Sequence, residues 1–177
     1  MVFVITGPCS VGKSSVARVL VHMVRMSAHL DRDNIPWMSD TTLSAVSERC
    51  PGEFENLCSE WISAVAVAFH KARIHLVVDC YIDFARESLL DKLLDRFEAN
   101  DIPNLVFRLT CAADEHLRRD RTREPDSQIG KGGVSYFAEM KVPHSKGIIE
   151  IDTTALSVEE VAADILERAG ADIAFAL

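Results

Sequence analysis

The amino-acid sequence predicts an α/β protein of three layers, in which a five-stranded parallel β-sheet is covered by helices on both faces. Short apolar runs alternate along the chain with longer segments in which apolar residues recur at helical spacing. The run HLVVD at 75–79 is apolar at consecutive positions, as expected of a strand that is covered on both faces. Strands that alternate with helices are joined by right-handed crossovers, which make the strands parallel.

The first half of the chain contains three of the predicted strands. The apolar run VFVIT at 2–6 is the first, and the helical pattern from 14 to about 24 follows it. A shorter run at 27–30 is the second strand. A long helix from about 53 to 71 comes before the third strand, because apolar side chains recur there at helical spacing. These side chains are Phe54, Leu57, Trp61, Ile62, Val65 and Phe69.

The second half contains the last two strands and two further helices. A helix from about 86 to 97 precedes the fourth strand at 104–109, and the fifth strand covers 148–152. The last helix spans 157–170, because Ser157 begins a capping box and a glycine ends the helical pattern. Met23, Met26 and Trp61 are assigned to the core.

Composition and charge exclude several classes of protein. With 177 residues and 48% apolar residues, one domain spanning 1–177 is expected. The net charge of −8 argues against a nucleic-acid partner, because phosphate backbones are bound by clustered Lys and Arg. No run of ~18 apolar residues or signal peptide is found, so we expect a cytoplasmic protein without a membrane partner.

Two further features leave alternatives open. The five cysteines lack CxxC and Cys/His spacing, so they are predicted to be free thiols and not zinc ligands or disulfides. The apolar tail at 171–177 is expected to cover a strand edge, pack on the last helix or form a dimer contact. The chain is therefore expected to be a monomer or a homodimer.

The most specific motif is GPCSVGKS at 7–14, which follows an apolar strand and opens a helix. Gly7 and Gly12 let the backbone curl so that successive N–H groups face a phosphate, and the helix N-terminus adds its positive end. Lys13 is predicted to reach the β- and γ-phosphates, and the Ser14 hydroxyl to bind Mg²⁺. The residues predicted to hold the nucleotide here are Gly7, Cys9, Ser10, Val11, Gly12, Lys13, Ser14 and Ser15.

Three aspartates follow predicted strands, where ligands of open α/β sheets bind. Asp31 and Asp33 come after the second strand and, if that segment is extended, point to the same side. One of them can serve magnesium while the other accepts a proton from a substrate hydroxyl. Asp79 ends the third strand and is predicted to serve magnesium. The alternatives are a polar turn for the first two and a plain strand-end cap for Asp79.

The segment 118–133, RRDRTREPDSQIGKGG, is rich in arginine and glycine and has almost no apolar residues. Arg119 and Arg123 lie four apart on a predicted helix, so both can face one site. Guanidinium groups bind phosphate oxygens and stack on adenine, and a mobile lid that carries them would exclude water. At least one of Arg119, Arg121 and Arg123 is predicted to contact nucleotide; the alternative is a solvated loop.

The sequence resembles the small P-loop kinases that phosphorylate metabolites and antibiotics, namely the shikimate and gluconate kinases and, above all, the chloramphenicol phosphotransferase family. The resemblance covers nearly the whole chain. The stretches that carry it are GPCSVGKSS, PGEFENL with WISAVA and IHLVVD, RRDRTR, and IEIDTTALSVEEVAADIL.

The resemblance implies a fold and a set of site residues. The fold is that of the P-loop NTPases, with the parallel sheet in the order 2-3-1-4-5 and a short arginine-bearing lid. Asp33 is the implied catalytic residue, and Lys13 and the lid arginines Arg119 and Arg123 the implied phosphate contacts. The adenine site is implied near Thr153 and Thr154, and magnesium is implied at Asp31. One departure is Cys80, which follows Asp79 where the antibiotic kinases have a second acid.

These observations favour an ATP-dependent phosphotransferase that moves the γ-phosphoryl group of Mg·ATP to a hydroxyl of a small molecule. The acceptor is an antibiotic, a sugar, a nucleoside or another metabolite. Two alternatives stay open: a nucleotide-binding regulatory module, and a nucleotide or polynucleotide kinase. Asp33 discriminates between them, because neither a regulatory switch nor an already ionised phosphate acceptor needs a base.

Overall fold

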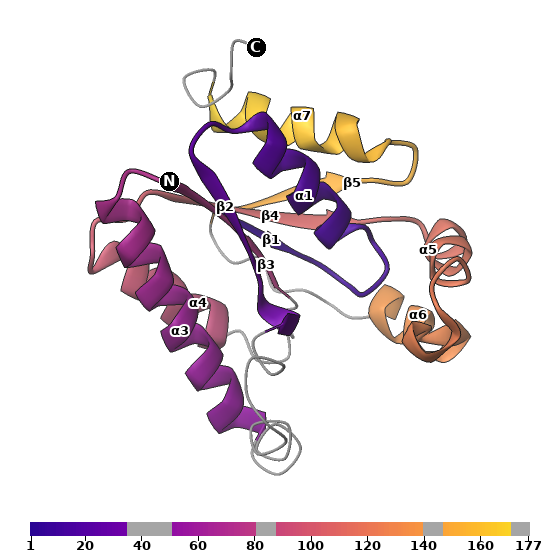
Figure 1. Cartoon of the computed structure of the whole chain (residues 1–177). Helices are drawn as coiled ribbons and strands as arrows, with labels where there is room; N and C mark the ends of the chain where they lie inside the picture. Colours follow the sequence, from indigo (N-terminus) through magenta and orange to yellow (C-terminus); the bar gives the residue numbers. More distant parts are fainter. Residues whose placement is uncertain (35–50, 81–87, 140–146, 171–177) are drawn as a thin grey trace.

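A computed structural model describes residues 1–34, 51–80, 88–139 and 147–170 (Figure 1). Within these ranges the chain forms five strands and six α-helices. The strands are β1 (Val2–Thr6), β2 (Ser27–Asp31), β3 (His75–Asp79), β4 (Asn104–Thr110) and β5 (Ile148–Asp152). The helices are α1 (Lys13–Met23), α3 (Pro51–Lys71), α4 (Ser88–Glu98), α5 (Ala113–Asp120), α6 (Gly130–Glu139) and α7 (Val158–Ala169). A short 3-10 helix, η3 (Pro125–Ser127), precedes α6.

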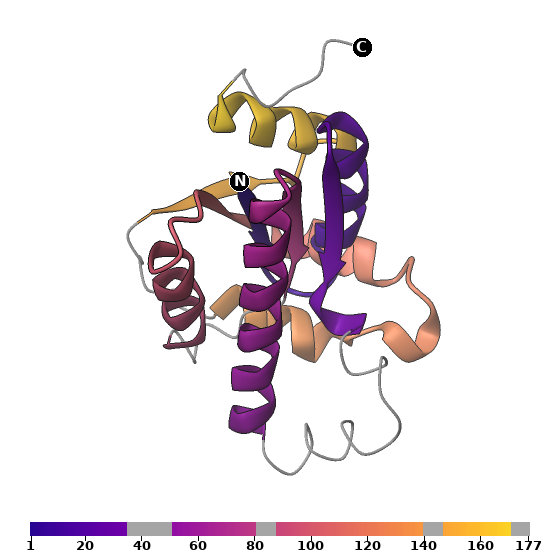
Figure 2. The same ribbon diagram turned by 60° about the vertical axis from the view of Figure 1, so that its left-hand side comes forward.

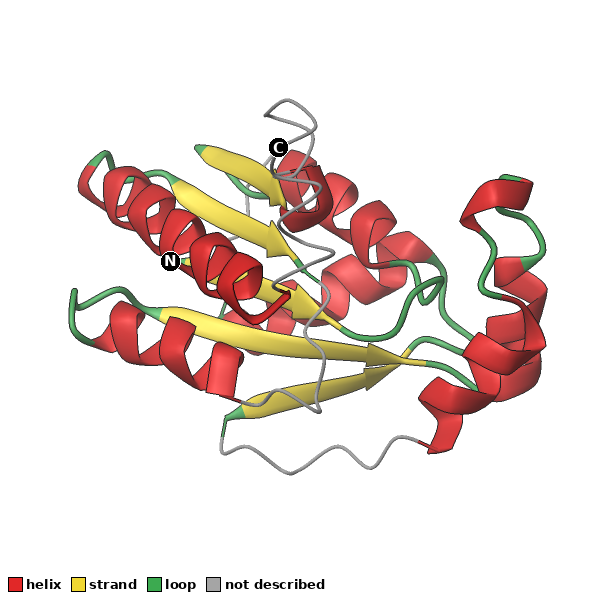
Figure 3. Ribbon diagram, turned by 90° about the horizontal axis from the view of Figure 1, so that it is seen from below, coloured by secondary structure: helices red, strands yellow, loops and turns green. Residues whose placement is uncertain are grey.

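All neighbouring strands of the sheet are parallel, and their order is β2-β3-β1-β4-β5, which confirms the prediction. The arrowheads of the strands all point to one edge of the sheet (Figure 3). Asp31 pairs in register with Asp79 at this edge, and Thr110 pairs with Asp152. The polar ends of separate strands are therefore brought to the same side of the molecule.

The two faces of the sheet carry separate layers of helices, because side chains alternate along each strand. Val2 and Val4 of β1 pack toward α3 and α4, whereas Phe3 and Ile5 pack toward α1 and α7. The two pairs of helices lie on opposite sides of the sheet in both views (Figures 1 and 2). All five residues of β1 are buried, which explains why its sequence lacks polar alternation.

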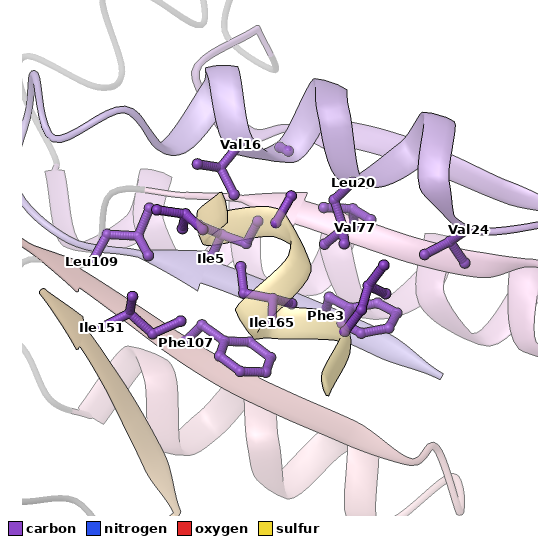
Figure 4. Packing of buried hydrophobic residues seen from close by; sticks show 14 of the residues in the cluster. Phe3, Ile5, Val16, Leu20, Val24, Val77, Phe107, Leu109, Ile151 and Ile165 are labelled. Atoms are coloured by element: carbon purple, nitrogen blue, oxygen red, sulfur yellow. The ribbon is translucent and has the colours of Figure 1, made fainter. Parts of the chain in front are cut away.

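The layer of α1 and α7 positions the loop that precedes α1. Val16 and Leu20 of α1 point onto the sheet, next to Ile5 of β1 and Ile165 of α7 (Figure 4). Each of these four side chains has a relative exposure of 2% or less. Burying a side chain of this kind contributes ~1.5–3 kcal/mol, so the start of α1 is firmly fixed against the sheet.

The core assignment of two residues is wrong. Trp61 of α3 is 37% exposed and Met26, in the connection between α1 and β2, is 58% exposed. The buried face of α3 carries residues such as Ile62 and Ala66, which pack against the sheet. Hydrophobicity alone does not decide which face of a helix is covered.

The arginine- and glycine-rich segment differs from its expected form. Helix α5 ends at Asp120, so Arg123 lies beyond it and not on the same helix as Arg119. Residues 130–133 are not a loop but the first turn of α6. Two backbone N–H groups at this point, those of Ile129 and Gly130, donate to the Asp120 side chain. This satisfies donors that a helix start otherwise leaves open, and it lets a glycine-rich sequence begin a helix.

The last helix agrees with its prediction in detail. Ser157 accepts from the backbone N–H of Glu160, and Glu160 accepts from the backbone N–H of Ser157, which completes the capping box. The tail at 171–177 lies outside the described residues. None of the described helices is long and apolar enough to cross a membrane.

Candidate active site

A cavity of about 760 Å³ opens at the edge of the sheet where the strands end. Ligands of open α/β sheets bind at this edge. Three stretches of chain line it: residues 9–16 before and within α1, side chains between 115 and 123, and residues 153–158 after β5. Asp33 joins them from the segment after β2. The structure thus gathers most of the residues that the sequence nominated into one cavity.

The loop between β1 and α1 has the backbone shape that its glycines predicted. Gly7 has a φ of 139°, and a Cβ there would lie 2.3 Å from the backbone oxygen of Leu109. Gly12 precedes α1 with a φ of 99° and caps it without a side-chain hydrogen bond. The first N–H groups of α1 therefore have no capping side chain, and they lie where a phosphate would be bound.

Lys13, the lysine of the loop, lines the same cavity. Its Nζ donates to the backbone oxygen of Pro8 at 2.9 Å, across the curl of the loop. This bond holds the charge of Lys13 next to the first residues of the loop. Ser14 and Ser15 follow it on the first turn of α1 and also line the cavity.

Asp79 is 3% exposed and lies at the end of β3, beside the loop. Burial raises the pKa of its carboxyl group, while a hydrogen bond with Ser14 and the charge of Lys13 oppose this effect. Its Oδ2 is buried, with no hydrogen-bond partner among the described residues, and lies 3.9 Å from Nε2 of His29. A buried carboxylate oxygen of this kind, next to a serine hydroxyl, fits the oxygen ligands that Mg²⁺ prefers.

The expectation that the chain stays extended from Asp31 to Asp33 is wrong. Residues 32–34 turn with 3-10 geometry, so the strand does not continue past Asp31. The carboxylate of Asp31 accepts from the backbone N–H of Asp33 at 2.9 Å and from the side chain of Asn34 at 3.0 Å. An aspartate that bonds the N–H two residues later makes a turn, and a turn ends the alternation of side chains.

The turn separates the surroundings of the two carboxylates. Asp31 lies in register with Asp79, and its charge helps to raise the pKa of Asp79. Asp33 lines the cavity, and its side chain is 67% exposed and pairs with Arg32 at 3.2 Å. Their assignments to magnesium and to the acceptor stay predictions.

Arg119 connects two walls of the cavity. Its Nε donates to Glu115 at 2.6 Å, and its Nη1 donates to the backbone oxygen of Val11 at 3.1 Å. Nη1 and Nη2 also donate to the hydroxyl and the backbone oxygen of Thr153, at 2.9 and 2.6 Å. An arginine has five N–H donors, so only one is left for a ligand. Most of the hydrogen-bonding capacity of Arg119 is therefore used within the protein, and its contact with a nucleotide stays a prediction.

Glu115 and the turn after β5 hold this arrangement. Hydrogen bonds from Arg118 and then Arg119 lower the pKa of Glu115 to about 2. Thr153 is 2% exposed, and its hydroxyl donates to the backbone oxygen of Thr110. Thr154 accepts from the backbone N–H of Ala112 at 2.8 Å. Both threonines line the predicted adenine site, and their hydroxyl groups bond mainly to the protein itself.

Arg123 faces the loop although it is not on the predicted helix. Its Nη1 donates to Oγ of Ser10 at 3.1 Å, and it lies 3.7 Å from the carboxylate of Asp120. Its side chain is 37% exposed, compared with 21% for Arg119. The two arginines therefore line one cavity, as predicted, but Arg123 has more donors left for a ligand.

Two buried side chains that hold the site in place, those of Asp120 and His116, were among the residues that the sequence analysis missed. Asp120 accepts from Ser10 of the loop at 2.9 Å, and Nε2 of His116 lies 2.5 Å from the backbone oxygen of Cys9. Both side chains are buried, at 1% and 3% exposure. Their spacing of four places them on one face of α5, which was the available signal. In a helix this polar, however, the pattern does not reveal which face is covered.

Residues 1–170 match the family described as chloramphenicol phosphotransferase-like protein. A search of curated protein sequences gave no significant match.

Solved structures share the fold over nearly the whole chain. A tunicamycin resistance protein of Deinococcus radiodurans has 21% identity and a TM-score of 0.66, covering 99% of this chain and 98% of that one. A sugar kinase from Janibacter sp. HTCC2649 has 15% identity and a TM-score of 0.69, with coverages of 97% and 94%. A gluconokinase from Sinorhizobium meliloti 1021 has 16% identity and a TM-score of 0.65, with 94% of each chain covered.

Proposed function

Since the chain belongs to the chloramphenicol phosphotransferase-like family, we propose that it transfers the γ-phosphoryl group of ATP to a hydroxyl group of a small molecule. The observation that carries this proposal is the composition of one cavity of about 760 Å³. A phosphate-binding loop, two arginines and an exposed carboxylate meet there, and these are the parts that phosphoryl transfer requires.

The triphosphate would lie over the loop before α1. The open N–H groups at the start of α1 bind phosphate oxygens, and Lys13 adds a positive charge above them. Arg123 lies beside Ser10 of the same loop with donors to spare. Cations in such positions stabilise the charge that spreads over the phosphoryl oxygens in the transition state.

The base of the nucleotide would lie at the other end, between α5 and the turn after β5. The face of Arg119 and the apolar side chains of Leu156 and Val158 line this end. Guanidinium planes stack on aromatic rings, and Leu156 is 37% exposed and thus available for contact. Hydrogen bonds hold Arg119 in the plane that stacking needs.

We propose that the hydroxyl of Ser14 and the carboxylate of Asp79 would hold a magnesium ion. Asp31 is the second carboxylate that we propose for this ion. The ion would neutralise charge on the phosphates. Asp79 itself is suited to this role because its buried Oδ2 has no hydrogen-bond partner among the described residues.

Asp33 is the residue that we propose to orient the acceptor hydroxyl and take its proton. Its carboxylate lines the cavity and pairs only with Arg32 among the interactions found for the described residues. Cys80, which occurs where antibiotic kinases have a second acid, cannot replace it. Burial raises the pKa of this thiol to about 12, so it stays protonated near neutral pH.

The proposal includes antibiotics and sugars as acceptors. Proteins of the same fold are named as a tunicamycin resistance protein, a sugar kinase and a gluconokinase, which supports acceptors of either kind. A regulatory module is disfavoured, because a carboxylate at the mouth of the cavity has no role in nucleotide binding alone.

The test is a coupled assay of ADP release with Mg·ATP against hydroxylated antibiotics, sugars, nucleosides and nucleoside monophosphates. We expect acceptor-dependent ADP release with a compound that carries a free hydroxyl, and a phosphorylated product by mass spectrometry. Tight binding of Mg·ATP without any acceptor-dependent release would favour the regulatory module. Release with nucleoside monophosphates alone would favour a nucleotide kinase.

A further inference from the structure

The side chain of Asp120 is buried beside the phosphate-binding loop and connects three segments. Its Oδ1 accepts from the hydroxyl of Ser10 at 2.9 Å and from the backbone N–H of Ile129 at 3.0 Å. Its Oδ2 accepts from the backbone N–H of Gly130 at 2.8 Å. Arg123 lies 3.7 Å away. A single carboxylate thus joins the loop before α1, the end of α5 and the start of α6.

The contacts of this carboxylate favour its charged form, although the residue is only 1% exposed. Burial alone would raise the pKa of Asp120, but hydrogen bonds from Ile129, Gly130 and Ser10 outweigh burial and lower it. The charge of Arg123 acts in the same direction. Hydrogen bonds to a charged acceptor are roughly twice as strong as neutral ones, so the three donors, Ser10, Ile129 and Gly130, are held firmly.

Ser10 is the point where this arrangement meets the nucleotide site. It has a φ of 66°, a left-handed conformation that is unfavourable for residues other than glycine. Such a conformation persists only where the surroundings over-determine it. Its hydroxyl donates to Asp120 and accepts from Nη1 of Arg123, so both groups hold it in place.

We propose that Asp120 is a positioning residue that sets the phosphate-binding loop and Arg123 for the triphosphate before it binds. This inference rests on the proposed function, because it takes the ligand of the loop to be a nucleoside triphosphate. Asp120 does not itself touch the ligand; it acts through Ser10 and Arg123. It also joins α6 to the loop, so Thr122 and Arg123, which line the cavity, lie in a segment that Asp120 fixes at both ends. Misplacement of such groups by about 1 Å can slow a reaction ~10²-fold.

The central variant is Asp120→Asn, which keeps the size of the side chain but removes its charge and one acceptor. We expect the transfer rate at saturating Mg·ATP to fall by about tenfold or more, since Arg123 and Ser10 lose their fixed partner. Asp120→Glu keeps the charge and should recover part of the rate. The matched control is Asp164→Asn, which removes the carboxylate of the Asp164–Arg168 pair on α7, far along the sequence from the loop.

A merely structural role predicts a different result. In that case Asp120→Asn lowers the free energy of unfolding but leaves the rate of the folded enzyme at the parent value, and this would overturn the proposal. A second variant, Ser10→Ala, sharpens the distinction. If Asp120 acts through Ser10, the double variant is hardly slower than the slower single variant. If the double variant is instead slowed by the product of the two single effects, Asp120 does not act through Ser10, and the proposal is contradicted.

A measurement without nucleotide separates this inference from the proposed function. We expect Asp120→Asn to speed amide hydrogen exchange at Val11–Lys13 and at Ile129 and Gly130, compared with the parent and with Asp164→Asn. We also expect it to weaken binding of inorganic pyrophosphate. Unchanged exchange and unchanged pyrophosphate binding would overturn the inference. Absence of any phosphoryl transfer by the parent protein would instead overturn the proposed function, and the exchange and pyrophosphate results would stand.

Discussion

The two ends of the cavity differ in how they are built. At the end between α5 and the turn after β5, Arg119 makes four hydrogen bonds within the protein and Thr153 is 2% exposed. At the end beside β2, Asp33 is 67% exposed and pairs only with the neighbouring Arg32 among the interactions found for the described residues. The first end, with Arg119 and Thr153, is held by contacts between distant segments, and we call it the braced end. The second end, with Asp33, is held only by a local turn, and we call it the exposed end.

This difference has a consequence for the roles of the residues. A substitution at the braced end removes contacts of the fold together with the contacts that we propose to the nucleotide, so we expect it to alter stability and affinity together. A substitution at the exposed end removes little structure, so its effect falls on the chemical step. The middle of the cavity, where Lys13 lies over the loop, should affect both affinity and rate.

The largest effect is expected from Lys13→Ala, at the middle of the cavity. It removes the charge nearest the β- and γ-phosphates, where fixed electrostatic groups supply much of the rate enhancement. We expect transfer at least ~10²-fold slower and weaker binding of Mg·ATP, measured by ADP release and titration calorimetry. Lys71→Ala, at the exposed end of α3, is the control. Undiminished turnover at saturating ATP would contradict the assignment of the loop.

Asp33→Asn tests the exposed end by itself. The amide keeps the shape of the side chain but cannot take a proton from the acceptor hydroxyl, so we expect transfer to fall ~10²-fold. The affinity for Mg·ATP and the free energy of unfolding should stay near the parent values, which titration and urea unfolding can check. Asp95→Asn on the exposed side of α4 is the control. A parent-like rate would mean that no base is needed, which would favour a phosphate acceptor.

Arg119→Lys tests the braced end. Lysine keeps the positive charge but cannot form the fork of bonds to Val11 and Thr153, so buried acceptors lose partners. We expect about 1–3 kcal/mol loss in the free energy of unfolding and weaker binding of Mg·ATP. The limiting transfer rate should change less than with Asp33→Asn. Arg168→Lys on α7 is the matched control, because its pair with Asp164 joins no distant segments. A slower transfer rate with parent-like free energy of unfolding and parent-like affinity for Mg·ATP would contradict this difference between the two ends.

The smallest effect concerns the pH dependence of the braced end. Hydrogen bonds from Arg118 and then Arg119 lower the pKa of Glu115 from 4.5 to about 2. A carboxylate with a lowered pKa stabilises the folded state above its unfolded pKa, and this stabilisation is lost as the pH falls toward the folded value. For Glu115 the loss therefore occurs between about pH 4.5 and about pH 2.

The check is the stability of Glu115→Gln measured against pH. We expect the variant to be slightly less stable than the parent at pH 7, and the difference to shrink as the pH falls through this window. Glu98→Gln, at the exposed end of α4, should show no such convergence. A difference that is constant from pH 7 to pH 2 would mean that Glu115 acts through its shape and not its charge.

Much of the site was predictable, because it depends on short-range patterns. The loop GPCSVGKS implies its own backbone shape through Gly7 and Gly12, and Ser157 with Glu160 implies a helix start. The alternation of strands with helices likewise led to the parallel sheet. Two errors near the site arose where a local pattern was extended too far: past Asp31, where the strand ends in a turn, and past Asp120, where the helix ends before Arg123.

What the chain order alone could not reveal is which polar residues are buried together. Ser10 and Asp120 are 110 positions apart, and Arg119 reaches Val11 across 108. The periodicity of a polar helix such as α5 is the same whether its His116 and Asp120 face water or the loop. Local backbone preferences and apolar spacing therefore determined the strands, the phosphate-binding loop and the last helix. The folded sheet decided the partners of each charged side chain, because hydrogen bonds in a buried site form only between groups that long-range packing has brought within reach.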